Sequence, residues 1–122
     1  MRFVLLVIKH FGGIEYAEVR FGPGLNVLYG PNDLGKSTLA AALRAVLLLP
    51  HGSSEAEKFV SWRGDFSPEV TLTFADADDR LWRVTKSFGG SRGSSFLESS
   101  KDGRDFLSEV KGREVDERLR KM

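Results

Sequence analysis

The 122-residue sequence predicts an α/β fold, and three local patterns support that prediction. A short apolar strand over residues 25–29 runs into a loop bounded by glycines. A helical period of apolar residues begins at Lys36. Residues 66–107 alternate in polarity as antiparallel strands do. With a mass of 13.6 kDa, residues 1–122 are expected to form one domain.

The first region, about residues 1–50, is expected to hold strands, the loop and the helix. Val, Ile and Phe are frequent in Arg2–Lys9, and Ala17–Phe21 is expected to form the return strand. The helix from Lys36 carries apolar residues at i, i+4, i+7 and i+8, a stripe typical of a helix that packs on a sheet, namely Leu39, Leu43, Val46 and Leu47. A proline and a glycine then end it.

The second region, about residues 66–107, is expected to be an antiparallel β lobe, because apolar residues alternate with threonine and charged residues. The expected strands are Val70–Ala75, Leu81–Phe88, Phe96–Ser99 and Arg104–Leu107. A short helix is expected over Glu55–Val60. The tail, about residues 109–122, returns to helical spacing with Val115, Leu119 and Met122 on one stripe. This helix is expected to lead to a coiled coil beyond the chain.

The loop after the first region's last strand fits Gly-x-x-x-x-Gly-Lys-Ser, the phosphate-loop pattern. Loop N–H groups and the positive end of the following helix converge on one point, which suits a polyphosphate. Lys36 would reach the β- and γ-phosphates, Ser37 would coordinate Mg²⁺, and Thr38 would contact the α-phosphate. The predicted nucleotide-binding residues are Gly30, Pro31, Asn32, Asp33, Leu34, Gly35, Lys36, Ser37 and Thr38. A glycine-rich turn with an unrelated lysine is the disfavoured alternative.

The groups needed for hydrolysis are not evident. Phosphate-loop enzymes hold Mg²⁺ with an acidic residue at the end of a second buried strand. Asp76 is the nearest candidate, but the run before it alternates with threonine, so we do not expect it to bind the metal. The chain also has no glutamine to orient water. We expect this chain to bind ATP and Mg²⁺ weakly, to hydrolyse ATP negligibly, and to contain no catalytic residue.

Composition narrows the classes further. A net charge of +1 excludes a protein that holds nucleic acid by bulk electrostatics, so any contact with DNA must be local. The absence of cysteine excludes disulfides, thiolate metal sites and cysteine nucleophiles. The apolar run Phe3–Ile8 is too short for a signal sequence or a membrane span. The sequence therefore predicts a cytoplasmic protein with no membrane partner.

Basic residues gather on the predicted hairpin after Asp79. The candidates for contact with the DNA backbone are Arg80, Arg83, Lys86 and Arg92. A solvated sheet face with no binding role is the favoured interpretation, because Trp82 is the one aromatic residue placed to stack on a base.

The loop and its flanks resemble the N-terminal start of the SMC, SbcC and RecN group of ABC-type ATPases, which includes Rad50. The residues that carry the resemblance are Phe3–Lys9, Phe11-Gly12-Gly13 and Gly24–Thr38. The stretches Val70–Phe106 and Gly112–Leu119 also resemble the antiparallel lobe and the helix before the coiled coil. One departure is Gly12-Gly13, where members often carry Arg or Lys followed by Ser near the nucleotide.

The resemblance implies a phosphate-loop NTPase of the ABC-ATPase type, specifically an N-terminal lobe with an added antiparallel β-sheet, incomplete without its C-terminal half. It implies ATP and Mg²⁺ as ligands, a C-terminal half-head and a second head as partners in a homodimer, DNA, and a nuclease subunit. The implied role is double-strand-break repair or chromosome maintenance. Two alternatives stay open: a small phosphotransferase that uses Arg80–Arg92 as a lid, and a non-enzymatic nucleotide-sensing module.

Overall fold

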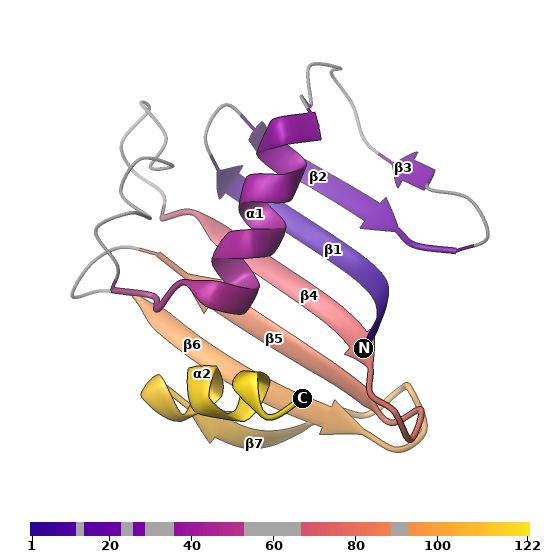
Figure 1. The fold of residues 1–122 in the computed structure, drawn as a ribbon. Coiled ribbons are helices and arrows are strands. Elements are labelled where there is room, and N and C mark those ends of the chain that lie inside the picture. The colour runs from indigo at the N-terminus through magenta and orange to yellow at the C-terminus, as the bar shows by residue number, and fades with distance from the viewer. Residues whose placement is uncertain (12–13, 23–25, 29–35, 53–66, 89–92) are drawn as a thin grey trace.

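The computed structural model describes the chain over residues 1–11, 14–22, 26–28, 36–52, 67–88 and 93–122 (Figure 1). The elements in chain order are β1 Arg2–Phe11, β2 Ile14–Arg20, β3 Asn26–Leu28, α1 Lys36–Leu48, β4 Glu69–Ala75, β5 Leu81–Ser87, β6 Ser94–Ser100, β7 Leu107–Lys111 and α2 Arg113–Arg120. The helix expected over Glu55–Val60 lies outside the described residues. No helix in the described part of the chain is long and apolar enough to cross a membrane.

Within the described residues, the seven strands form one sheet in the order β3-β2-β1-β4-β5-β6-β7. Every neighbouring pair is antiparallel. The two predicted regions are continuous, because β1 pairs with β4 and sets Leu6 opposite Leu72. The antiparallel β lobe is therefore an extension of the first region's sheet. Both helices lie on the same face of that sheet, α1 across β1, β4 and β5 and α2 beside β6 and β7 (Figure 1).

The core lies between that face and the helices. Strand alternation brings Leu72 and Val84 opposite each other on the covered face, and Val84 opposite Leu97 on the next strand. These side chains are fully buried. Burying each of them contributes about 1.5–3 kcal/mol relative to exposure.

Small residues set the position of α1. The predicted leucine stripe is only partly right, because Ala42, Ala45 and Val46 are fully buried while Leu39 and Leu43 are half-buried. Alanine at the centre of the contact lets the helix axis approach the strands, and the larger leucines then flank the line of contact. The sequence period identified the correct side of the helix but not its central line.

The fourth strand of the lobe, expected at Arg104–Leu107, instead runs from Leu107 to Lys111. The cause is a tight loop closed by Asp102. Its Oδ1 accepts hydrogen bonds from the N–H groups of Arg104 at 2.8 Å and Asp105 at 3.0 Å. Gly103 takes a φ of +80°, which favours glycine. These bonds hold the backbone in a loop, so pairing with β6 starts only at Leu107.

Candidate functional site

The predicted phosphate loop lies between β3 and α1. β3 ends at Leu28 and α1 begins at Lys36, so a strand precedes the motif and a helix follows it. Lys36, Ser37 and Thr38 form the first turn of α1. Gly30, Pro31, Asn32, Asp33, Leu34 and Gly35 lie outside the described residues. The helix start places the positive end of a helix dipole beside the motif, which suits bound phosphate, and the roles of the individual residues remain predictions.

The far end of α1 is held by a side chain that reaches across from β5. Lys86 is fully buried, and its Nζ donates hydrogen bonds to the Leu49 carbonyl oxygen at 2.7 Å and to Asp116 Oδ1 at 2.6 Å. Burial lowers the pKa of Lys86, while the hydrogen bond and the charge of Asp116 oppose that shift. The ammonium therefore joins the end of α1, β5 and α2 at a single atom.

The basic residues predicted to share one DNA-contacting face are separated by the sheet. Lys86 faces the core and is opposite Val70, whereas Arg83 lies on the other face opposite Thr73. Side chains three positions apart on a strand point to opposite sides. The placement of Lys86 on an exposed basic face is thus wrong, because its ammonium is buried against protein atoms. Arg92 lies outside the described residues.

Arg83 is held on the uncovered face. Its Nε and Nη2 donate to the two carboxylate oxygens of Glu98, each at 3.0 Å, and its guanidinium lies 4.2 Å from the centre of the Phe106 ring. Arg80 is held too, since its Nη2 donates to Ser99 Oγ at 2.7 Å and Glu109 Oε1 at 3.1 Å. Both guanidinium groups thus have carboxylate partners, which weakens the idea that this hairpin is a mobile lid.

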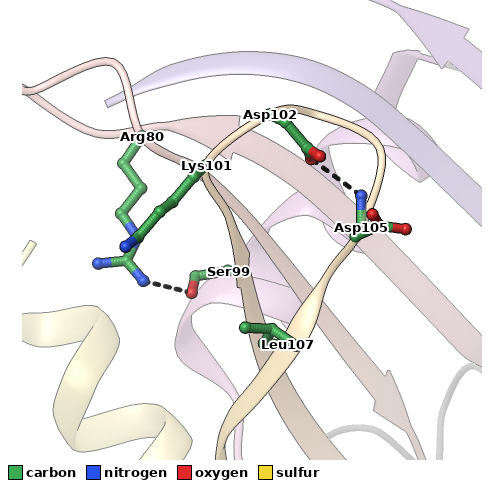
Figure 2. Close-up of a pocket in the computed structure, with 6 residues that line it drawn as sticks. All are labelled: Arg80, Ser99, Lys101, Asp102, Asp105 and Leu107. Atoms are coloured by element: carbon green, nitrogen blue, oxygen red, sulfur yellow. Dashed lines mark hydrogen bonds between the residues drawn. The ribbon is translucent and has the colours of Figure 1, made fainter.

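Arg80 also lines a pocket of about 210 Å³ at the turn end of β6 and β7 (Figure 2). The lining residues are Arg80, Ser99, Lys101, Asp102, Asp105 and Leu107. Arg80 Nε is buried and has no hydrogen-bond partner among the described residues. Because two cations and two carboxylates share the lining, the pocket has balanced charge and gives a polyanion no clear preference.

Asp76 has a structural role in the β4–β5 turn. Its Oδ2 accepts a hydrogen bond from Trp82 Nε1 at 2.8 Å, and its Oδ1 accepts from the N–H groups of Asp78 at 2.8 Å and Arg80 at 3.1 Å. The Trp82 hydrogen bond is the main reason that the pKa of Asp76 lies below its usual value, and the two backbone donors add to the shift. These contacts hold Asp76 within the β4–β5 turn.

The similarity to known proteins covers nearly the whole chain. A family model described as an AAA domain matches residues 5–121. The chain belongs to this family. The match includes the phosphate-loop motif, both helices, β2 to β7, and β1 from residue 5 onward. This AAA domain therefore has the motif in the context that the sequence predicted.

The relatives of this AAA domain are named for DNA replication, DNA repair or the maintenance of chromosomes. It is 28% identical over 112 residues to the DNA double-strand break repair Rad50 ATPase of Methanopyrus kandleri, covering 89% of this chain and 13% of that protein. It is 29% identical over 97 residues to structural maintenance of chromosomes protein 5 of Schizosaccharomyces pombe, a match that covers 76% of this chain and 9% of that protein. It is 51% identical over 49 residues to the DNA replication and repair protein RecF of Magnetococcus marinus, covering 40% and 12%.

These matches confirm the resemblance to the N-terminal region of SMC-, SbcC- and Rad50-like ABC-type ATPases. The chain spans between 9% and 13% of the length of those three relatives. What their names say of replication, repair and chromosome maintenance is therefore said of much longer proteins.

Sequence reasoning missed the bridge made by Lys86 in this AAA domain. Its partners Leu49 and Asp116 are 37 and 30 residues away along the chain, so no local pattern joins them. One signal was available. Lys86 occupies the same strand face as Trp82 and Val84, which alternation marks as buried, and a lysine on a buried face needs partners.

Proposed function

We propose that the chain is the ATP-binding half-head of an SMC/SbcC-like ATPase that acts in DNA double-strand-break repair or chromosome maintenance. The observation that carries the proposal is the motif Gly30–Ser37, set between β3 and α1 in an AAA domain. Loop N–H groups and the start of α1 would hold the phosphates, with Lys36 on the β- and γ-phosphates and Ser37 on Mg²⁺. The bound Mg²⁺ would neutralise charge that develops on the phosphate oxygens.

Hydrolysis in this proposal requires groups from outside the chain. Asp76, the acidic residue that the sequence offered for the metal, is used in the β4–β5 turn, so the proposal takes the catalytic carboxylate from elsewhere. A C-terminal half-head and a second head would supply the catalytic carboxylate and close on the nucleotide. The full assembly would be a cytoplasmic homodimer that engages DNA, with a nuclease subunit as a further partner.

The first test is nucleotide binding by the 122-residue chain, measured by calorimetry with ATP and Mg²⁺. Lys36→Ala should abolish binding, because it removes the ammonium that faces the phosphates. A matched control is Lys101→Ala, which changes an exposed lysine far from the motif in the sequence. If Lys36→Ala binds ATP as the unchanged chain does, the phosphate-loop assignment is wrong.

The second test is turnover. Phosphate release by the chain alone should stay below about 0.1 s⁻¹, against the 1–10³ s⁻¹ usual for enzymes. Adding the C-terminal half of the same protein should raise it. Faster release by the chain alone, or transfer of phosphate to a nucleoside, would instead favour the phosphotransferase alternative.

Within this lobe, we propose Arg80 and Arg83 as contacts for DNA, and we leave out Lys86. Both side chains are more than a third exposed, at 39% and 38%, so a phosphate can approach them, whereas Lys86 is buried. Arg80→Ala and Arg83→Ala should each weaken binding of duplex DNA by the assembled heads and reduce its salt dependence. Unchanged binding and salt dependence in both variants would remove Arg80 and Arg83 from the DNA contacts.

A further inference from the structure

The buried ammonium of Lys86 occupies the place where α1, β5 and α2 meet. Its side chain is fully buried, and the Asp116 side chain is 13% exposed, so the pair is shielded from solvent. A buried lysine is costly unless it is hydrogen-bonded and neutralised, and Lys86 meets both conditions through Asp116 in α2 and the Leu49 carbonyl just after α1. The three elements therefore share one buried polar contact beside the apolar core.

Lys86 supplies a positive charge near the C-terminal end of α1. The last turn of α1 contains no basic residue. The final carbonyl groups of a helix have no partner within it and carry partial negative charge. The Nζ of Lys86 donates at 2.7 Å to the carbonyl of Leu49, the residue directly after α1, whose own N–H donates to the Ala45 carbonyl in the last turn. A cation from a strand thus fixes the end of α1 that lies opposite the phosphate-loop motif.

A helix passes a constraint at one end to the other because it is stiff. α1 has 13 residues and starts at Lys36 within the motif. Its fully buried side chains are Ala42, Ala45 and Val46, which leave the helix close to the strands, and half-buried leucines pack on either side of them. Small side chains hold a helix against sliding less firmly than large interlocking ones. The polar contact at Leu49 is therefore well placed to set its axial position.

For α2, the contact with Lys86 is one of few anchors. α2 has 8 residues, and its buried side chains are Val115 and Leu119. Asp116 lies between them in sequence and reaches Lys86 Nζ at 2.6 Å. A movement of α2 would therefore shift or break the contact that also holds Leu49.

We propose that Lys86 is a positioning residue for the phosphate loop, and that its ammonium couples nucleotide binding at the start of α1 to the placement of α2. This inference rests on the proposed function, because it assumes that ATP binds at the motif. Coupling of this kind is reciprocal: if α2 influences the affinity for ATP through Lys86, then ATP influences the stability of α2 through the same contact.

The test compares two double variants that each replace an ion pair by apolar residues. Lys86→Met with Asp116→Leu removes the bridge and leaves no unpaired charge. Arg20→Met with Glu18→Leu is the control, since it removes a partly exposed ion pair on β2, a residue pair with no role in the proposed binding. The readouts are the Kd for ATP with Mg²⁺ by calorimetry and the amide exchange of residues 113–120 with and without ATP.

The first double variant should weaken ATP binding about threefold to tenfold, and the control should change it by less than about twofold. ATP should slow amide exchange in α2 of the unchanged chain and of the control, but not in the Lys86 and Asp116 variant at saturating ATP. A purely structural bridge would lower the melting temperature and leave both readouts unchanged, and that result would overturn the inference.

Two further outcomes are decisive. If the unchanged chain binds no more ATP than Lys36→Ala does, the proposed function is wrong, and this inference fails with it. If the double variant does not fold, Asp116→Asn replaces it, because asparagine keeps an oxygen acceptor for Nζ and removes only the charge. Weaker ATP binding by Asp116→Asn would then support the coupling, and unchanged binding would overturn it.

Discussion

Two ion pairs on β5 lie on opposite faces of the sheet and differ in almost every physical respect. Arg83 and Glu98 form a two-point pair on the uncovered face, with side chains 38% and 25% exposed. Lys86 and Asp116 form a single contact under the helices, 0% and 13% exposed. The first pair joins adjacent strands that already share backbone hydrogen bonds. The Lys86–Asp116 pair joins β5 to α2, which share no backbone hydrogen bonds among those described. The pair with the single hydrogen bond to its carboxylate therefore has the larger role in holding the fold together.

The largest effect should come from leaving Lys86 without its carboxylate. Asp116→Leu alone should lower the free energy of unfolding by about 3–5 kcal/mol, because an uncompensated charge would stay buried. Urea denaturation followed by tryptophan fluorescence measures the loss. Adding Lys86→Met to Asp116→Leu should recover most of it. A loss below about 1 kcal/mol for the single variant would show that water reaches the ammonium.

A smaller effect is expected where the chain leaves α1 and passes the end of β5. A Cβ on Gly93 would lie 2.8 Å from the Ser87 carbonyl oxygen and 2.9 Å from that of His51, and both are backbone atoms that cannot swing aside. Gly93→Ala should therefore cost about 1–3 kcal/mol in urea denaturation. Ser94→Ala, at the next position, is the control and should cost much less. Equal costs would mean that this junction is looser than its distances indicate.

The exposed pair should contribute least at neutral pH. Arg83→Met should lower the free energy of unfolding by about 0.2–1 kcal/mol, because both side chains are partly solvated and solvent screens their attraction. The difference between Arg83→Met and the unchanged chain should shrink further in about 1 M salt. A loss as large as that of Asp116→Leu would refute the contrast between the two faces.

The contribution of Asp76 to the free energy of unfolding should depend on pH, which separates charged from uncharged contacts. Its hydrogen bonds lower its folded-state pKa below the usual value of 3.8, so the folded chain binds fewer protons there than the unfolded chain does. The resulting stabilisation is present above pH 3.8 and is lost as the pH falls through the lower, folded-state pKa. The stability advantage over Asp76→Asn should therefore be constant near neutral pH and disappear in acid. An advantage that persists in strong acid would show that charge is not its source.

Local patterns in the sequence predicted the elements well, and contacts between distant residues were out of their reach. Alternation located β4 and β5 to within a residue, and the phosphate-loop motif located the start of α1 at Lys36. The last strand was displaced because the hydrogen bonds of Asp102 extend the preceding loop. Counting strand faces would have separated Arg83 from Lys86, but nothing local pairs Lys86 with Asp116.

The candidate site was predictable to the extent that its motif is contiguous. The residues Gly30–Ser37 carry their chemistry in a short run, and the helix after them follows from the apolar period. The contact of Lys86 with Leu49 and Asp116 could not be predicted in this way. It depends on how far α1 and α2 lie from β5, which is decided by packing across the whole sheet and cannot be read from any one segment.

The alanines of α1 have an evolutionary consequence. Ala42 and Ala45 are both fully buried where the helix meets the sheet. A larger residue at either place would push the helix outward unless a facing strand residue became smaller in the same lineage. In homologues, a larger residue at position 42 or 45 should therefore occur together with a smaller facing residue in β4. The summed volume of the facing side chains should change little.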